Sequence, residues 1–469
     1  MKIWATILCG WLGSCFFISA QTLQAIYNFN GPNNPGANGR LLISGNLLYG
    51  TTGGAGTGNS GTIFKLTTNG TGYNILKSFS KLDVNTSTNV DGSYPMDGLV
   101  LYSNALYGTT YQGGFNTRGT VFSLNTNGTS YTVLNHFNIT NGKNPYVGLT
   151  LWSNALYGTT AAGGASNRGA IFRVNADGTG FVLLKSLMSS EGALLLSRVE
   201  TDGSMLYGSI YSGGISNRGS LFGMSINGDN FTILKQFSTG EGAGPRFNLI
   251  LSGGKLYGAA EVGGTNNDST IFRINTDGSG FAVLKQFSDT DQIYGTNSDG
   301  SSIWGGLTFW NGVLYGTTRW GGTNGNGVVF KLNTDGTGYA VLKHFSATTS
   351  SGGGPYINVG GMNPHGDLTI ADGVIYGATQ SGGTYGYGTL YRLTIPPNPA
   401  LQTTNVTGQL VVYWADDGLN RTLQTSSDLL SGNWTSVTSL NWTNASVVPK
   451  RIGLSIGDTS ATAAFFRLQ

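Results

Sequence analysis

Residues Leu314 to Phe345 read LYGTTRWGGTNGNGVVFKLNTDGTGYAVLKHF, and the chain contains seven copies of the order that begins this stretch. A Leu-Tyr-Gly or Ile-Tyr-Gly triplet opens each copy, with its tyrosine at Tyr49, Tyr107, Tyr157, Tyr207, Tyr257, Tyr315 and Tyr376. Fifteen positions later an aromatic residue always follows, at Phe64, Phe122, Phe172, Phe222, Phe272, Phe330 and Tyr391. A fixed internal period is typical of repeat architectures, in which every copy forms the same small unit.

Each copy is predicted to form four antiparallel strands, which we call a to d. In the second copy they are expected at residues 98–102, 105–110, 119–125 and 131–137, where the sequence is apolar or alternates. In six copies a turn pair separates strands c and d: Asn69-Gly70, Asn127-Gly128, Asp177-Gly178, Asn227-Gly228, Asp277-Gly278 and Asp335-Gly336. Such pairs favour the two positive φ angles of a type I′ turn. Small antiparallel four-stranded units in tandem indicate a β-propeller.

The seventh copy lacks its strand d, because the chain enters a proline-rich stretch at Ile395–Pro399 instead. The segment Leu23–Phe29 resembles strand d of the sixth copy, Tyr339–Phe345. We therefore predict an all-β fold: a seven-bladed β-propeller over residues 21–395, closed by its N-terminal strand. The alternative is a linear solenoid, which needs no such complementary strand and leaves strand edges exposed.

The order Leu-Tyr-Gly-Thr-Thr, Gly-Gly, Gly-Thr-Val-Phe, Asp-Gly-Thr resembles the Gloeo_Verruco (GloVer) tandem repeat of exported bacterial proteins. The resemblance covers residues 21–392, and residues 314–345 match it closely. It implies a secreted repeat protein without an assigned biochemical role. The placement of Gly-Gly and aromatic residues is also similar, more distantly, to kelch repeats.

Residues 1–20 are expected to be a signal peptide. Lys2 is a positive start, the run to Phe17 is apolar, and Ile18–Ala20 suits cleavage. The run is shorter than the roughly 20 residues that a membrane anchor needs. Both cysteines, Cys9 and Cys15, lie here, so the mature chain has no thiol. We expect a protein that is secreted or at the cell surface, with lipoprotein anchoring at Cys15 as the alternative.

Composition excludes several kinds of partner. Charged residues make up 10% of the chain and the net charge is +3 without a basic run, which argues against nucleic acid. No apolar stretch after the N-terminal segment is long enough for a transmembrane helix in the mature chain. Glycine contributes 76 residues, which suit tight turns, and aromatic residues at 11% can supply a core.

The last part of the chain changes character after the linker 396–400. Residues 401–469 contain less glycine and three tryptophans, Trp414, Trp434 and Trp442. Residues 410–414 and 464–468 are apolar enough to form strands, and the length suits a small C-terminal β-sandwich module. We give equal weight to two roles for this module: adhesion or retention at the surface, and a passive folding cap.

Loops that vary in length are confined to one predicted face of the ring. Alternating strand direction places the b–c and d–a loops on one face and the c–d hairpins on the other. The d–a loops before Tyr107, Tyr315 and Tyr376 are longer than the rest, whereas the c–d hairpins keep one length. Variable loops on one face of a repeat array favour binding there. The aromatic candidates in the b–c loops are Tyr111, Phe115, Tyr211, Trp320, Tyr385 and Tyr387.

Charged residues on that face give two further hypotheses. Arg118, Arg168 and Arg218 occupy one slot in successive copies and suit acidic groups, or else are simply solvated. An oxygen-bearing side chain precedes glycine sixteen residues before five of the repeat tyrosines, at Asp91, Asn141, Glu191, Glu241 and Asp299. Such groups can bind calcium or simply form turns. The metal candidates in the fifth d–a loop are Asp289, Asp291 and Asp299.

A catalytic set is not evident. The chain has four glutamates and three histidines, and two of these, His136 and His344, share one slot of strand d. We therefore predict a non-catalytic binding or scaffold module, with an extracellular polysaccharide or a surface protein as partner. The alternative is a propeller-fold polysaccharide lyase or hydrolase, in which His365 and the three aspartates of the fifth loop would act.

Overall fold

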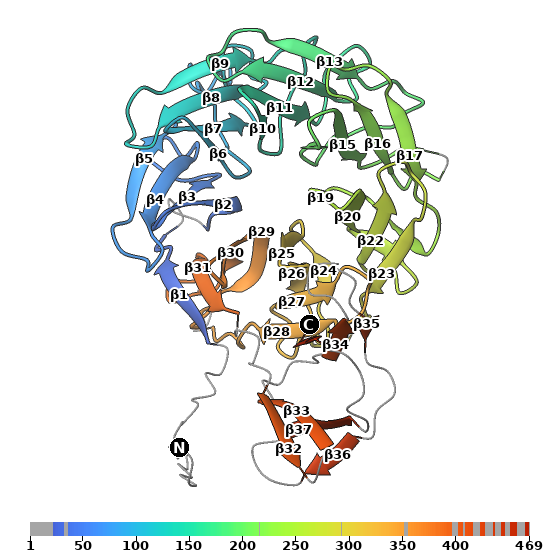
Figure 1. The fold of residues 1–469 in the computed structure, drawn as a ribbon. Coiled ribbons are helices and arrows are strands. Elements are labelled where there is room, and N and C mark those ends of the chain that lie inside the picture. Colours follow the sequence, from blue (N-terminus) through green and yellow to red (C-terminus); the bar gives the residue numbers. More distant parts are fainter. Residues whose placement is uncertain are drawn as a thin grey trace. The chain divides into compact units, whose positions relative to one another are not determined.

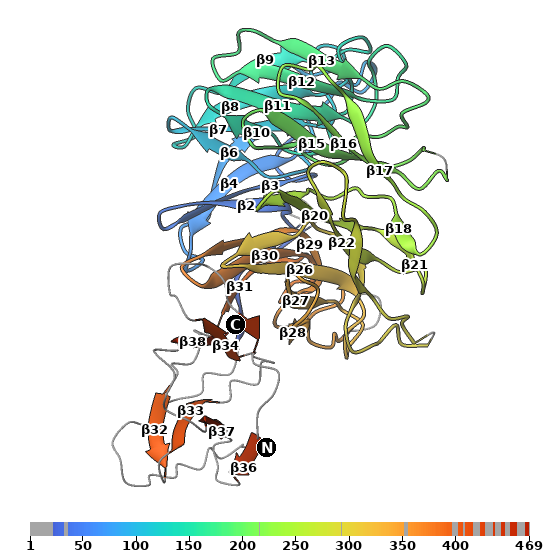
Figure 2. The ribbon, with the colours of Figure 1, turned by 45° about the vertical axis from the view of Figure 1, so that its right-hand side comes forward.

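The computed structural model describes residues 22–31, 36–214, 216–291, 293–350 and 355–395, and seven strands beyond residue 400. The chain divides into two units, of which Leu23–Leu393 is the larger. In that unit seven antiparallel sheets stand around a common axis (Figures 1 and 2). The all-β, seven-bladed propeller is confirmed. The described residues form no helix, so none of them belongs to a helix that could span a membrane.

The blades are numbered in chain order, and each is given from the innermost strand outward. Blade 1 consists of β2 (Asn38–Ser44), β3 (Leu47–Thr52), β4 (Thr62–Thr67) and β5 (Asn74–Ser78). Blade 2 consists of β6 (Val100–Tyr102), β7 (Ala105–Thr110), β8 (Thr120–Asn125) and β9 (Thr132–His136). Blade 3 consists of β10 (Thr150–Trp152), β11 (Ala155–Thr160), β12 (Ala170–Asn175) and β13 (Val182–Ser186). Blades 4 and 5 consist of β14 (Glu200–Thr201), β15 (Met205–Ile210), β16 (Ser220–Ser225), β17 (Thr232–Gln236); and β19 (Ile250–Ser252), β20 (Lys255–Ala260), β22 (Thr270–Asn275), β23 (Ala282–Gln286).

Blade 6 consists of β25 (Thr308–Trp310), β26 (Val313–Trp320), β27 (Val328–Asn333) and β28 (Ala340–His344), and β24 (Ser301–Ile303) extends it beside β26. Blade 7 contains β29 (Met362–Ala371), β30 (Val374–Ser381), β31 (Thr389–Thr394) and, beside β31, β1 (Leu23–Asn28). A small two-stranded sheet of β18 (Glu241–Ala243) and β21 (Val262–Gly264) lies in the loops of blade 5. In blade 2 the observed strands agree with the predicted ones within two residues.

The c–d hairpins differ from the predicted type I′ turn. In blade 2 the Gly128 amide donates to the Asn125 carbonyl at 2.8 Å, and Gly128 has a φ of 90°. Asn127, although described, is not among the residues with positive φ, and the same holds for the five equivalent Asn and Asp residues. The loop is therefore a type I turn followed by a glycine bulge. The Asn127 Oδ1 instead accepts hydrogen bonds from the amide (3.0 Å) and hydroxyl (2.7 Å) of Thr129.

The core lies between successive blades, and the Tyr-Gly pair of the repeat explains how it packs. In blade 3, Gly158 on β11 pairs with Phe172 on β12, and the Phe172 ring is fully buried. A Cβ atom on Gly158 would lie 2.4 Å from the Phe172 Cζ, so the ring rests directly on the glycine. The same glycine–aromatic contact recurs in every blade. The repeat keeps glycine there because any side chain would displace the core ring.

The segment β1 occupies the position of strand d in blade 7. It pairs antiparallel with β31, with Gln24 opposite Arg392. The Phe29 amide donates to the Gly388 carbonyl at 3.1 Å, as the Phe79 amide donates to the Gly61 carbonyl at 3.0 Å in blade 1. Phe29 itself is fully buried in a cluster shared by blades 7 and 1.

The smaller unit is described only by the backbone of its strands. A four-stranded antiparallel sheet has the order β32 (Gln402–Val406), β33 (Gln409–Ala415), β37 (Arg451–Ile456), β36 (Trp442–Ala445). A three-stranded sheet has the order β35 (Thr435–Ser436), β34 (Leu423–Ser426), β38 (Phe465–Leu468). The predicted signal peptide with Cys15 and the linker 396–400 lie outside the described residues.

Replacement of Gly158 by alanine tests the contact between glycine and the core ring. Gly158→Ala is expected to lower the free energy of unfolding by about 1–3 kcal/mol, because the Phe172 ring must move to admit the new methyl group. Gly31→Ala is the control, since a Cβ there meets no atom within 4 Å. Chemical denaturation of both variants measures the effect. If Gly158→Ala proves as stable as the wild-type protein, this explanation of the repeat is wrong.

Candidate functional site

The seven copies are uniform at some positions and diverge at others. Eight residues before the repeat tyrosine every copy has a buried aliphatic residue: Leu41, Leu99, Leu149, Val199, Leu249, Leu307 and Leu368. Eleven residues before the tyrosine every copy differs: Asn38, Met96, Tyr146, Leu196, Arg246, Trp304 and His365. The ninth position before it also varies: Arg40, Gly98, Gly148, Arg198, Asn248, Gly306 and Asp367. The divergent residues lie directly before the uniform buried aliphatic residue, where the chain enters the innermost strand of each blade. We therefore take this entry to the innermost strands as the candidate site.

A repeated hydroxyl group fixes four of these strand entries in space. In four copies the residue two positions after the repeat tyrosine donates its hydroxyl hydrogen to a carbonyl of the next blade, just before that blade's innermost strand. The equivalent bonds run from Thr51 to Asp97 (3.0 Å), from Thr109 to Val147 (2.9 Å), from Thr159 to Ser197 (2.9 Å) and from Ser209 to Pro245 (2.6 Å). In the other three copies Ala259 and Ala378 have no hydroxyl, and the Thr317 hydroxyl has no partner among the described residues. The motif therefore holds the divergent residues of blades 2 to 5 in a fixed backbone frame.

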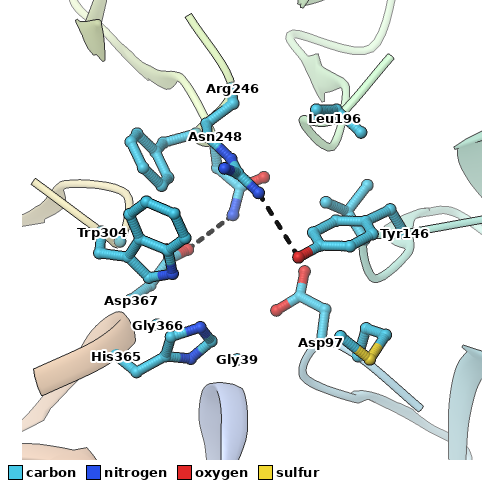
Figure 3. Close-up of a pocket in the computed structure, with 14 residues that line it drawn as sticks. Gly39, Asp97, Tyr146, Leu196, Arg246, Asn248, Trp304, His365, Gly366 and Asp367 are labelled. Atoms are coloured by element: carbon cyan, nitrogen blue, oxygen red, sulfur yellow. Dashed lines mark hydrogen bonds between the residues drawn. The ribbon is translucent and has the colours of Figure 1, made fainter. Parts of the chain in front are cut away.

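The divergent residues surround a pocket on the axis of the ring, to which all seven blades contribute (Figure 3). Its empty volume, including the part that is open to solvent, is about 470 Å³. Tyr146, Arg246, Trp304 and His365 form much of the wall. Aromatic walls with a few convergent polar groups are typical of small-ligand sites.

A hydrogen-bonded network of buried charged and polar groups lies across the channel at the base of this pocket. Asp367 of blade 7 accepts hydrogen bonds from Arg198 of blade 4 at 3.3 Å and from the Asn248 side chain of blade 5 at 2.7 Å. It also accepts one from the Gly306 amide of blade 6 at 2.5 Å. On the other side, the Asp97 carboxylate accepts bonds from the Gly98 and Gly148 amides, both at 2.7 Å. We call Asp97, Arg198, Asn248 and Asp367 the floor.

Glycines next to the floor leave room for its carboxylates. A Cβ atom on Gly306 would lie 2.7 Å from an oxygen of Asp367, and one on Gly39 would lie 2.3 Å from an oxygen of Asp97. These copies carry glycine where others carry larger side chains, so the two carboxylates can approach backbone amides closely.

Burial changes the acidity of the floor groups. Loss of hydration raises the pKa of Asp97 and that of the neighbouring Glu200. For Arg198, burial by itself disfavours the charge, but the attraction of Asp97 and Asp367 outweighs this cost and raises its pKa. The guanidinium therefore stays charged and holds the floor together.

Two arginines meet the same indole ring at the mouth of the pocket. The guanidinium carbons of Arg246 and Arg319 each lie 4.7 Å from the centroid of Trp304. Arg246 has longer polar contacts, at 3.4 Å each, to Glu261 and to the Tyr146 hydroxyl. Arg319 donates to the Gln380 side chain at 3.1 Å. We call Tyr146, Arg246, Trp304 and Arg319 the mouth.

His365 faces the pocket from blade 7 (Figure 3). Its Nδ1 is buried and has no hydrogen-bond partner among the described residues. Burial, together with the positive charges of Arg319 and Arg246, lowers the pKa of His365 to about 4. Its imidazole is therefore neutral at neutral pH and contributes an uncharged ring to the pocket wall.

Three of the six predicted aromatic residues lie next to the mouth rather than in the pocket wall. Tyr111 packs edge-on against Tyr146, with ring centroids 5.8 Å apart. Trp320 lies 5.1 Å from the Arg319 guanidinium, and its side chain is 42% exposed. Burial and the nearby Glu261 carboxylate raise the pKa of Tyr211. Glu261 is also the ion-pair partner of Arg246, so Tyr211 lies close to the mouth.

The other three predicted aromatic residues make different contacts. Phe115 stacks on His136, with centroids 4.1 Å apart. Tyr387 packs against the core cluster between blades 7 and 1, and Tyr385 is 51% exposed. None of the three lines the pocket.

The predicted arginine cluster is distributed over three seams between blades. The carbonyl oxygens of Arg118, Arg168 and Arg218 each accept a hydrogen bond from the d–a loop of the following blade, at 2.8–3.0 Å. The Arg168 Nε also donates to Ser189 at 3.2 Å. Each arginine belongs to its own seam, and none of the three lines the pocket.

The predicted oxygen ligands contact protein groups instead of gathering around one point. Asp299 pairs with Lys285 at 2.5 Å, and Lys285 lies over the Tyr339 ring of the next blade at 4.7 Å. Equivalent pairs join Lys77 to Asp91, Lys185 to Glu191 and Lys235 to Glu241. Asp291 accepts hydrogen bonds from two amides of its own loop, and Asp289 is exposed. Within the described part of the chain, no three acidic, histidine or cysteine side chains are grouped as a metal site requires.

Two comparisons with known proteins bear on the fold. The model of the Gloeobacter/Verrucomicrobia repeat matches residues 10–199 and again 103–298. No curated protein matches the sequence. An oligogalacturonate lyase from Vibrio parahaemolyticus is similar in structure, with 10% identity, coverage of 81% of this chain and 98% of its own, and a TM-score of 0.50. The extracellular domain of a hybrid two-component system from B. thetaiotaomicron has 12% identity, coverage of 84% and 46%, and a TM-score of 0.49. At such identities the likeness concerns the fold alone.

The buried neutral His365 is expected to make stability depend on pH. The unfolded histidine takes up a proton below about pH 6.5, whereas the folded one does so only near pH 4. The free energy of unfolding should therefore fall as pH falls through this window, by up to about 3 kcal/mol. His365→Gln, which keeps a polar side chain, should lose this contribution. Arg246, Arg319 and Asp367 lie near position 365 in both proteins, and the raised pKa values of Asp97 and Glu200 act on stability in the opposite direction in both.

Urea denaturation of the two proteins at pH 7, 5.5 and 4.5 isolates the histidine, because only the difference between them is used. Equal slopes of stability against pH would contradict the neutral buried state of His365.

Proposed function

This chain belongs to the Gloeobacter/Verrucomicrobia repeat family, and we propose that its propeller is a non-catalytic binding module that acts outside the cytoplasm, with carbohydrate as its ligand. One observation carries the proposal. The seven copies share the residues of the core, and they all differ at one position, where six of the seven side chains wall the axial pocket. A scaffold without a ligand has no need for seven different side chains there.

The chemistry of the pocket supports a sugar as the ligand. Tyr146 offers a flat aromatic surface, which suits the apolar C–H face of a sugar ring, and Trp304 adds an indole that already packs against Arg246 and Arg319. The floor supplies acceptor oxygens at Asp97 and Asp367 for sugar hydroxyls. Because Arg198 reaches across the channel to Asp367, a ligand enters from the mouth and ends at the floor.

The second candidate function is a polysaccharide lyase or hydrolase, and one residue favours it. His365 lines the pocket with a neutral imidazole that can accept a proton, but its pKa of about 4 makes it a weak base at neutral pH. The aspartates predicted to act with it do not join it: Asp291 is engaged in its own loop, Asp299 pairs with Lys285 and Asp289 is exposed. Release of reducing ends from a polysaccharide panel, abolished by His365→Ala, would replace the binding proposal with this one.

Removal of the pocket tryptophan tests the carbohydrate proposal on a glycan array. Trp304→Ala is expected to weaken binding of the preferred glycan by about tenfold or more, because a central aromatic contact is lost. The double variant Trp320→Ala with Tyr385→Ala, which changes the flanking loops, should reduce binding of this glycan less. Trp152→Ala is the control, since Trp152 is 44% exposed at the other end of the innermost strand of blade 3. If no glycan binds, or if all variants bind equally, the proposal fails.

We further propose that β1 closes the ring in solution. The Asn28 side chain accepts a hydrogen bond from the Thr384 amide at 2.9 Å, and His136 accepts the equivalent bond from the Phe115 amide at 3.3 Å. The closing seam has its own aromatic contact, because Tyr27 stacks on Tyr73 with centroids 4.2 Å apart. The seventh blade therefore depends on a segment that lies more than 360 residues from its partner strand.

Deletion of residues 21–30 tests this closure. The variant is expected to aggregate or to unfold without cooperativity, because β31 loses its pairing strand and Phe64 of blade 1 loses its contact with Phe29. Size-exclusion chromatography and thermal unfolding measure both effects. A deletion variant that stays monomeric with an unchanged melting temperature contradicts the closure.

The smaller unit and the N-terminal segment complete the proposal. The two antiparallel sheets of residues 402–468 suit a small β-sandwich that serves either for adhesion at the surface or as a folding cap. Residues 1–20 suit export by signal peptide, with Cys15 as the site of lipid attachment in the alternative form.

A further inference from the structure

The mouth of the pocket holds more positive charge than its carboxylates balance. Arg246 and Arg319 both lie on Trp304, and Glu261, which pairs with Arg246, is the only acidic side chain that forms an ion pair with either of them among the described residues. His365 between the mouth and the floor adds no charge at neutral pH. One guanidinium group is therefore left without a negative partner.

Arg319 is the less compensated of the two. Its one hydrogen bond to another side chain is to the neutral Gln380 amide, and its Nε is buried without a partner. The nearby charge of Arg246 adds to the cost of burial, and both lower the pKa of Arg319. A half-buried guanidinium without an ion pair forms charge-assisted hydrogen bonds when an anion arrives.

The floor has the opposite polarity. Its carboxylates already accept hydrogen bonds from Arg198, Asn248 and backbone amides. An anionic group placed there would meet like charge, whereas hydroxyl groups could donate to the remaining lone pairs. The pocket thus favours a ligand with an acid group toward the mouth and hydroxyl groups toward the floor.

We infer that the axial pocket selects an acidic sugar, whose carboxylate binds the guanidinium groups of Arg319 and Arg246. The planar fork of arginine fits the two oxygens of a carboxylate. The indole of Trp304 holds both forks in place, so little side-chain freedom is lost on binding. This inference rests on the proposed function and names the ligand class within it.

The test compares matched ligands on the full chain. Isothermal titration uses hexauronates and the same oligosaccharides after reduction of their carboxyl groups to neutral alcohols. The acidic form is expected to bind about tenfold to a hundredfold more tightly, and its affinity should fall with added sodium chloride. Arg319→Gln should remove most of that difference, and the affinity of the variant for the neutral form measures how much of the change comes from altered packing on Trp304 rather than from the lost charge. Arg319→Lys, which keeps the charge but not the fork, should fall between the two.

Arg273→Gln is the matched control, because Arg273 contacts only a carbonyl of the next blade, Thr334, at 3.4 Å. Equal melting temperatures of the variants exclude unfolding as the cause. Equal affinity for acidic and neutral sugars overturns the inference but leaves the binding function intact. Preference for a sulfated neutral sugar over the uronate also overturns it. Absence of binding to every sugar overturns the proposed function itself.

Discussion

The structure depends on one repeated contact, in which an aromatic ring rests on a glycine of the neighbouring strand. In blade 3 the Phe172 ring occupies the space that a side chain on Gly158 would fill. The ring also contacts the preceding blade, where the ring of Phe137 lies 5.0 Å away between centroids. Each blade contributes one such ring to the seam, so a single sequence pattern sets both the packing within a blade and the packing between blades.

The same pattern explains why the pocket can vary without cost to the ring. A buried aliphatic residue fixes the backbone after every pocket position, and in blades 2 to 5 a hydroxyl bond also fixes it before that residue. Leu249 is buried three residues after Arg246, and the Thr159 hydroxyl holds the carbonyl next to Arg198. Side chains between these anchors point to the axis, where they pack against other blades rather than within their own. Seven independent choices at the axis are therefore compatible with one scaffold.

The sequence predicted most of the scaffold and little of the site. Spacing alone placed the four strands of blade 2 within two residues, because alternation and turns are local signals. The turn type was wrong, since Asn-Gly also suits a type I turn with a glycine bulge, and only the side chain of Asn127 decides between them by binding Thr129. The pocket could not be found from local signals, because Arg246 and Trp304 come from different blades. A comparison of the copies, position by position, would have revealed it.

The distribution of charge supports a candidate site at the axis. In four outer seams a lysine has a carboxylate partner, and where blade 2 carries Asn135 in place of the lysine, its partner position is Asn141, which is also neutral. In blade 6 the partner position of Lys343 is Gly360, so pairing at the rim is not complete. At the axis Arg198 pairs with Asp367, whereas Arg319 forms no ion pair among the described residues. A half-buried guanidinium of this kind is solvated by water in the free protein and can bind the carboxylate of a ligand. The contact of Arg319 with Trp304 in the pocket wall, rather than a cost of folding, is therefore what supports the proposed acidic ligand.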